Sequence, residues 1–209
     1  MTQPTTNCPN CGAKITFRWS GSVQTVCEFC RSILIRTDLD LQKVGQVADL
    51  PLNSSPIQIG AEGVFGKRAF SVIGRIIYEY DQGNWNEWHF VTNDGTSGWL
   101  SDAQLNYVVT FPASDQKLPR ECKIGQQYTW GNQTYIVSTI TKAHYCGVEG
   151  ELPFQYWDKS DVVFIDLMSH SEKFATIDYS EDPPLLFLGE SVEFNDLKLK
   201  NLRSFEGWS

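Results

Sequence analysis

The chain has 209 residues, of which 41% are apolar, and its formal net charge is −8. This length and apolar content permit a sizeable core in one or two domains. The longest apolar runs, at residues 162–165 and 185–188, are far too short to cross a bilayer. The first seven residues are polar, with neither a basic start nor an apolar stretch, so we expect no export signal.

Four cysteines near the amino terminus stand in two close pairs. Two residues separate Cys8 from Cys11, two separate Cys27 from Cys30, and residues 12–26 lie between the pairs. This spacing is typical of a zinc ribbon, in which each pair turns tightly and points both sulfurs at one ion. We therefore predict a structural Zn²⁺ held by these four thiolates, with no open position for catalysis. Two disulfides and free thiols are the alternatives.

The ribbon is predicted to span residues 1–37. Within it, residues 13–26 are expected to form a hairpin that presents the second pair to the first, and residues 33–35 to add a strand. So short a segment buries too little apolar surface to fold without metal. Thiolates and two further single cysteines suit a reducing compartment, so we expect a cytoplasmic protein. Residues 38–56 are polar and are interpreted as a linker.

Charge is distributed unevenly along the chain. Residues 1–37 carry four basic side chains against Glu28 alone, whereas the remainder carries 13 basic and 24 acidic residues. An acidic body repels phosphate backbones, which argues against nucleic acid as the main partner. Nucleic-acid binding through the ribbon alone remains an alternative.

Beyond the linker, β-branched and aromatic residues recur in short runs separated by turn residues. The expected strands cover residues 70–80, 88–92, 99–100, 107–111, 127–130, 133–140, 162–167, 174–179 and 185–188. Long helical periodicity is absent. We therefore predict a mainly β body, as a barrel or sandwich, with a first β unit at 57–118 and a second at 119–209.

The two β units share a short pattern of Ile-Gly, a later glycine, and an aromatic residue two positions before a valine. A shift of 65 residues places Ile59 on Ile124, Gly60 on Gly125, Gly66 on Gly131, Phe70 on Tyr135 and Val72 on Val137. We interpret the match as an internal repeat, because repeats with one period usually mean repeated units. The alternative is that hairpins share such patterns by chance.

No motif for catalysis is recognisable in the sequence. It has no phosphate-binding loop, nucleophile elbow or metalloprotease helix. The three histidines, His89, His144 and His170, are scattered and have no partner motif. If Trp88 and Phe90 face the core, His89 between them faces the other side of its strand. We predict that the protein is not an enzyme.

Two sets of residues are candidates for binding a ligand or partner. Glu149 and Glu151 stand two positions apart and can hold a cation, or form only an acidic turn. Trp88 and Trp99 lead a group of aromatic residues that can line a cage for an amine, pack in the core, or mark an interface. The rest of that group comprises Trp85, Trp130, Trp157, Tyr78, Tyr80, Tyr128 and Tyr156.

Six short motifs stand out along the body, at residues 72–76, 85–88 and 98–101 in its first half and at 148–153, 164–167 and 188–190 in its second half. These motifs resemble an uncharacterised bacterial family catalogued as a domain of unknown function. The resemblance covers residues 57–202, and Gly-Glu-Leu-Pro at 150–153 is its most specific part. Members of this family often carry a zinc ribbon in front.

The family's genes often lie beside those for polyamine-synthase-like, small membrane and membrane-stress proteins. The resemblance therefore implies a partner protein in a membrane-associated system. We accordingly expect a non-catalytic adaptor. A binding module for a small, polyamine-like cation is the alternative.

Overall fold

The computed structural model describes residues 5–37, 40–47, 55–114, 116–155 and 161–204, and strands dominate it. The amino-terminal strands are β1 (Thr5–Asn7), β2 (Lys14–Thr16), β3 (Gln24–Val26), β4 (Ser32–Arg36) and β5 (Leu41–Gln46). The next are β6 (Glu62–Phe65), β7 (Arg68–Tyr80), β8 (Gly83–Thr92), β9 (Ser97–Ala103) and β10 (Asn106–Ala113). The last are β11 (Gln127–Trp130), β12 (Gln133–Leu152), β13 (Asp161–Met168), β14 (Lys173–Asp178) and β15 (Leu185–Val192), before the 3-10 helix η1 (Phe194–Leu197). The predicted mainly β fold is confirmed.

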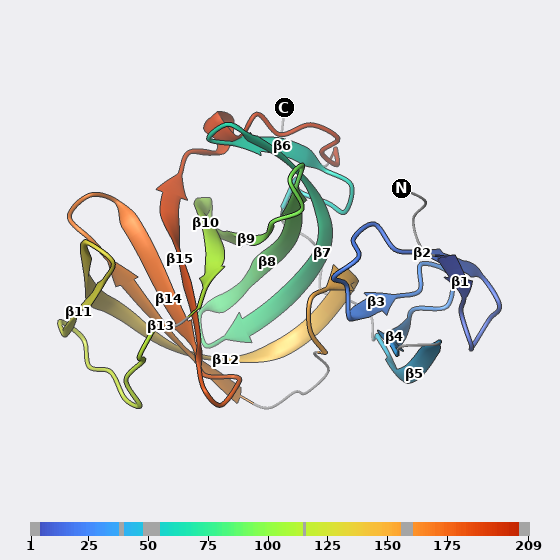
Figure 1. Ribbon diagram of the computed structural model, residues 1–209, viewed down its shortest axis with the longest axis horizontal. Coiled ribbons are helices and arrows are strands. Elements are labelled where there is room, and N and C mark those ends of the chain that lie inside the picture. Colours follow the sequence, from blue (N-terminus) through green and yellow to red (C-terminus); the bar gives the residue numbers. More distant parts are fainter. Residues whose placement is uncertain (1–4, 38–39, 48–54, 115, 156–160, 205–209) are drawn as a thin grey trace.

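Eight antiparallel strands form a closed barrel (Figure 1). The strands β7, β8, β9 and β10 follow one another as a meander, and β12 to β15 form a second meander. The strand β10 pairs with β15, and β7 pairs with β12, so the two meanders join at both edges. Closure leaves none of these eight strands as a long open edge.

The two halves of the body are built alike at their starts. The strands β11 and β12 begin 65 residues after β6 and β7, as the sequence shift requires. The Gly60 amide donates to the Val72 carbonyl at 2.9 Å, and the Gly125 amide donates to the Val137 carbonyl at the same distance. These matches support the interpretation of an internal repeat, which stays a prediction.

Apolar side chains cover the outside of the barrel as well as its inside. On the outer face of β8, Trp88 and Phe90 pack with Ile57 and Leu197, beneath β6 and η1. A second outer cluster lies beneath the β11 hairpin, around Leu167. The protein therefore buries both faces of much of its sheet, and the alternate residues of each strand face the barrel interior.

The ribbon does not contain the hairpin predicted for residues 13–26. Instead, β1 pairs with β2 and β3 pairs with β4, so each cysteine pair lies inside a hairpin of its own. The reason is local, because the amide of the first cysteine in each pair donates across its turn, from Cys8 to Ala13 and from Cys27 to Ser32. The strand β5, within the segment interpreted as a linker, pairs with β4.

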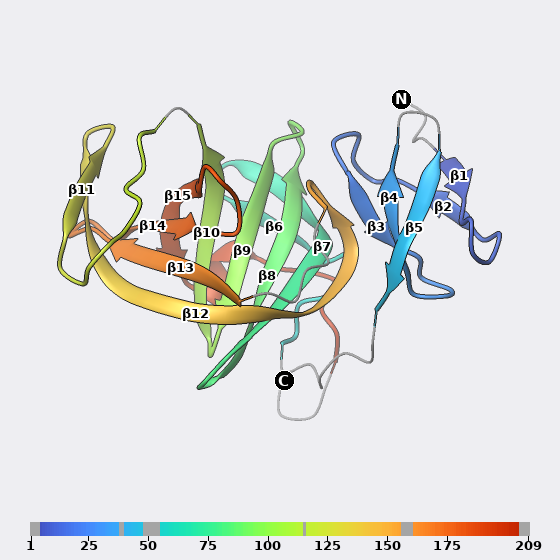
Figure 2. The same cartoon turned by 90° about the horizontal axis from the view of Figure 1, so that it is seen from below.

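The ribbon lies beside the barrel at the carboxyl end of β12, on the side of the molecule away from β11 (Figures 1 and 2). The strand β12 is long enough to pair first with β11 and β13, then with β7, and finally with β3. One continuous sheet therefore runs from the barrel into the ribbon.

Two glycines in the family-like motifs allow β7 and β12 to meet. Gly74 is the register partner of Gly150. A Cβ atom on Gly74 would lie 2.0 Å from the Glu151 carbonyl oxygen, and one on Gly150 would lie 2.2 Å from the Ile73 carbonyl oxygen. No side chain fits at either position, so these motif glycines close the barrel. Within the described residues, no helix has the length and apolar character that crossing a bilayer requires.

Candidate metal centre and barrel cavity

The four predicted cysteines converge on one point in the ribbon. Their Sγ atoms all lie within 4.8 Å of one another. The Cys8 and Cys30 sulfurs are 3.7 Å apart, as are those of Cys11 and Cys27. A tetrahedral ion with metal–sulfur bonds of about 2.3 Å places its ligands about 3.8 Å apart. The cluster therefore has the dimensions of a four-thiolate metal site.

The two halves of the cluster have the same backbone construction. The Gly12 amide donates to the Cys8 carbonyl, and the Arg31 amide donates to the Cys27 carbonyl, both at 2.9 Å. Gly12 and Arg31 both have positive φ, at 76° and 57°. Hydrogen bonding by Ser32, and next by Asn10, lowers the pKa of the Cys30 thiol, whereas desolvation and the neighbouring thiols raise the pKa of Cys11, as expected when four thiols share one site without a cation.

The barrel interior holds a cavity of about 610 Å³ that is partly open to solvent, with side chains from all eight strands in its wall. This volume lies within the range of small-molecule sites. Four acidic residues line it, and three of them are buried or half-buried: Glu87 on β8, Asp166 on β13 and Asp178 on β14. In the barrel order, β8 stands opposite β13 and β14, so the carboxyl groups lie on facing walls.

Burial makes these carboxyl groups unusual acids. Burial raises the pKa of Glu87 to about 8, and the charges of Asp166 and Asp178 add to the effect. Burial raises the pKa of Asp166 to about 6 and also raises that of Asp178. The Trp85 indole donates to a Glu87 Oε atom at 2.9 Å, which fixes that carboxyl group in the wall.

Aromatic rings pack around the carboxyl groups. The Trp85 ring stacks on Tyr78 at 5.1 Å between centroids and meets Tyr80 and Phe164 edge-on. At another part of the wall, Trp99 stacks on Phe154 at 5.8 Å. The cavity therefore combines aromatic faces with negative charge, as sites for organic cations do.

Few basic groups balance the charge of the cavity. The charged residues in its wall are Asp81, Glu87, Asp166, Asp178 and Lys142. The Lys142 ammonium is exposed and is paired with Asp161 at 2.6 Å. Among the ion pairs of the described residues, none involves the carboxyl groups of Glu87, Asp166 or Asp178.

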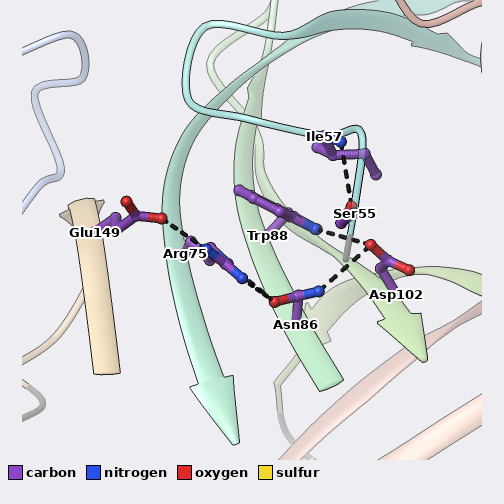
Figure 3. Close-up of polar contacts among 7 residues, drawn as sticks. All are labelled: Ser55, Ile57, Arg75, Asn86, Trp88, Asp102 and Glu149. Carbon is purple, nitrogen blue, oxygen red and sulfur yellow. Dashed lines mark hydrogen bonds and ion pairs between the residues drawn. The ribbon is translucent and has the colours of Figure 1, made fainter. Parts of the chain in front are cut away.

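Two of the predicted binding residues belong to a polar network on the outer face of the barrel (Figure 3). The Arg75 guanidinium donates to Asn86 Oδ1 at 2.9 and 2.5 Å and to Glu149 at 2.9 Å, and it lies over the Trp88 ring. Asp102 accepts weak hydrogen bonds from Asn86 and Trp88 at 3.5 Å. Glu149 and Trp88 are therefore engaged with protein partners outside the cavity.

The other two predicted residues have different roles. The Glu151 carboxylate accepts hydrogen bonds from the ribbon and does not converge with Glu149. Trp99 lines the cavity, as do Tyr78, Tyr80 and Trp85 from the wider aromatic group. Trp130 and Tyr128 lie in the cluster beneath β11, and Tyr156 and Trp157 lie outside the described residues.

Sequence reasoning missed the three cavity carboxyl groups. Asp166 stands between Ile165 and Leu167 and Asp178 between Ile177 and Tyr179, whereas Glu87 has one aromatic neighbour, Trp88, and one polar neighbour, Asn86. An acidic residue at the centre of an apolar strand was the available signal, because it faces away from the packed side chains.

The comparison with known proteins gives one family. The family described as Domain of unknown function (DUF4178) matches residues 58–194, well over half of the chain. The chain belongs to this family. The DUF4178 region covers the barrel from the segment before β6 to the start of η1 and excludes the ribbon. No curated protein and no solved structure matches the chain.

Proposed function

We propose that this protein is a non-catalytic binding module whose barrel takes up a small organic cation and whose ribbon is held by a structural zinc ion. One observation is the main support for cation binding in the barrel. A cavity of about 610 Å³ is lined by aromatic rings and by the carboxyl groups of Glu87, Asp166 and Asp178, and Lys142, the one ammonium among its described lining residues, is ion-paired with Asp161.

The electrostatics of the cavity favour a cationic ligand. Buried charges are costly unless they are paired, and carboxyl groups that face one another across a small space repel when ionised. In the empty cavity the Glu87 carboxyl group avoids this unfavourable free energy by staying protonated, and its pKa is therefore raised. A bound cation removes the repulsion and lets the groups ionise.

The aromatic wall favours an ammonium or alkylammonium group over a metal ion. Ring faces attract organic cations by about 0.5–2 kcal/mol each, and they offer no ligand atoms to a hard metal ion. The Trp85 and Trp99 rings both line the space. A linear amine such as spermidine, or a quaternary amine such as choline, can interact with both the aromatic rings and the carboxyl groups of the wall.

Calorimetry with matched ligands tests the proposal. We expect heat and a thermal shift with spermidine or choline, and neither with 3,3-dimethylbutan-1-ol, which has the shape of choline without its charge. Glu87→Gln should weaken binding, whereas Glu62→Gln, at an exposed position outside the barrel, should not. Absence of heat and of a thermal shift with both cations would sink the proposal.

The zinc half of the proposal is supported by the dimensions and thiolate chemistry of the cysteine cluster. Metal analysis should find about one zinc per chain, as one four-thiolate site requires. Cys8→Ser and Cys27→Ser should release it, because each removes one ligand. Native protein without metal would overturn this half and leave the cavity proposal intact.

A protein-interaction role is the second candidate, favoured by one exposed ring. Phe29, inside the second cysteine pair, is 75% exposed, the most exposed large apolar side chain among the described residues. An apolar tip on a rigid metal-held turn suits docking to another protein. A pull-down from the native host should lose its partner with Phe29→Ala, and a partner retained by that variant would exclude this surface.

A further inference from the structure

The last residues of β12 belong to the barrel and the ribbon at once. The strand pairs with β7 as far as Gly150, and its next two residues, Glu151 and Leu152, pair with Thr25 and Gln24 of β3. The Val23 amide also donates to the Leu152 carbonyl at 2.9 Å. Movement of the ribbon therefore acts directly on a barrel strand.

The Glu151 carboxylate holds the part of the ribbon that connects the two cysteine pairs. It accepts hydrogen bonds from the Arg18 amide at 2.8 Å, the Trp19 amide at 3.3 Å and the Ser22 hydroxyl at 2.5 Å. The side chain is buried, with Glu151 4% exposed. Its donors lie between Cys11 and Cys27 in the sequence, so the metal tethers their loop at both ends.

A chain of ring contacts continues from this loop to the cavity. The Trp19 ring meets the His89 ring edge-on at 5.5 Å, and His89 lies against Trp99 at 5.0 Å. Trp99 stacks on Phe154, and both rings line the cavity. Phe154 stands three residues after Glu151, so it moves with the shared strand end.

Apolar packing joins the same two regions. Ile33 of β4 is buried in the cluster that contains Tyr78 and Trp99 of the cavity wall, and Val26 and Val44 of the ribbon pack against it. The ribbon is therefore part of the wall structure at this end of the barrel and shares its core.

We propose that metal occupancy of the ribbon and cation occupancy of the barrel cavity are coupled, with the metal-bound ribbon bracing one wall of the cavity. Without metal the short ribbon cannot hold its fold. The loop then withdraws its donors from Glu151, and a buried carboxylate without donors is strongly unfavourable. The Glu151–Phe154 segment has to move toward water, and Trp99 loses its packing. The ligand side of this coupling rests on the proposed cation site.

Coupling between two sites is reciprocal, and this makes the proposal measurable from either end. Loss of the metal should weaken choline binding about fivefold or more, and choline should slow metal loss by a comparable factor. Choline is the probe because its quaternary nitrogen cannot bind zinc.

The first experiment needs no ligand. Hydrogen exchange of the full-length protein is measured with zinc bound and after removal by a chelator. We expect amides of β9 near Trp99 to exchange about tenfold faster without zinc, as local opening does, while those of β14 keep their rates. The strand β9 pairs only with β8 and β10, so ribbon unfolding by itself does not expose it. Unchanged exchange in β9 overturns the coupling.

The second experiment follows zinc transfer to a coloured chelator with and without saturating choline. We expect slower transfer with choline in the native protein and in Phe29→Leu, and no such effect in Trp19→Leu, which lacks the contact with His89. Choline that binds without slowing transfer overturns the coupling. If choline does not bind but zinc removal still speeds amide exchange in β9, the proposed cation site is wrong. The structural coupling between the ribbon and the barrel wall is then still supported.

Discussion

The imidazole Nδ1 of His89 lies 2.8 Å from the backbone carbonyl oxygen of Glu151, across the joint between β8 and the end of β12. A carbonyl oxygen only accepts, so Nδ1 carries the proton, and Nε2 accepts from the Ser97 hydroxyl at 2.8 Å. Burial lowers the pKa of His89 to about 4. His89 is therefore a neutral, fixed connector, and both of its ring nitrogens are already in use.

This neutral histidine should make the protein sensitive to acid. Its pKa is 6.5 in the unfolded chain and about 4 in the folded one. The unfolded chain gains this proton first as pH falls, so stability is full above pH 6.5 and about 3 kcal/mol lower at pH 4. The His89 contribution is measured by urea unfolding at pH 7 and 4.5 as the difference between the native protein and His89→Gln, because protonation of Glu87 stabilises the folded protein over the same range. His170→Gln, at an exposed site, is the control, and equal pH slopes in all three proteins would contradict the assignment.

Gly74→Ala should disrupt barrel closure. Its Cβ would lie 2.0 Å from the Glu151 carbonyl oxygen, a clash with backbone that no rotamer relieves. We expect a cost of about 3 kcal/mol or more, because overpacking against a fixed backbone exceeds the usual range for side-chain crowding. Gly45→Ala is the matched control, because its Cβ meets only the Ile33 side chain at 3.6 Å. Thermal unfolding of both variants makes the comparison, and equal melting temperatures would refute it.

The metal site could be predicted because cysteine spacing determines local geometry. Two intervening residues let each Cys-x-x-Cys turn direct both of its sulfurs to one point, and all four Sγ atoms lie within 4.8 Å of one another. The hairpin predicted between the pairs was wrong because the hydrogen bonds of each turn close a hairpin around its own cysteines. The cysteine spacing therefore identified the metal ligands, but it did not determine which two strands pair around each turn.

The cavity could not be predicted because alternation does not say which face of a strand is inside. Trp88 and Phe90 form the more apolar face of β8 and are fully buried in a core, which was one of three alternatives for Trp88. That core lies outside the barrel, beneath β6 and η1, so the opposite face with Trp85 and Glu87 lines the cavity. Only strand order brings Glu87 opposite Asp166, and that order depends on the long-range pairing of β7 with β12.

Arg75→Ala should destabilise the fold without affecting the cavity. Arg75 is 3% exposed and donates to Asn86 and Glu149 on the outer face. Removing one partner of a buried charged pair costs about 3–5 kcal/mol, because the remaining groups lose their donors. Urea unfolding measures the cost, and calorimetry of the folded fraction should find choline affinity unchanged. A stable variant with lost choline binding would show that the network belongs to the binding site.

Gly12→Ala should weaken metal binding modestly. Gly12 has a φ of 76°, and no atom lies within 4 Å of an added Cβ, so the cost is purely conformational. A side chain at positive φ costs about 1–2 kcal/mol, which corresponds to roughly fivefold to thirtyfold weaker zinc binding in a ribbon that folds with its metal. Competition with a coloured chelator measures the change, with Gly45→Ala as control. Equal zinc affinities would mean that this position of the first cysteine turn accepts a side chain at positive φ, as the equivalent position of the second turn accepts Arg31.

Choline affinity should rise with pH, because the cavity carboxyl groups must ionise to receive a cation. The Asp166 pKa is about 6 and that of Glu87 about 8 in the empty cavity. Choline keeps its charge throughout, so any pH dependence belongs to the protein. From pH 7 to pH 9 the ionisation of Glu87 alone should strengthen binding about tenfold, with a plateau above pH 8.

Stability of the empty protein should move in the opposite direction over the same range. The Glu87 pKa is 4.5 unfolded and about 8 folded, so its contribution is complete below pH 4.5 and is lost as pH rises through 8. Glu87→Gln should remove both the pH dependence of choline affinity and that of stability, whereas Glu62→Gln should keep both. Calorimetry and urea unfolding at pH 6, 7, 8 and 9 test the pair. Choline affinity that is flat or falls across this range would contradict an acidic cavity site.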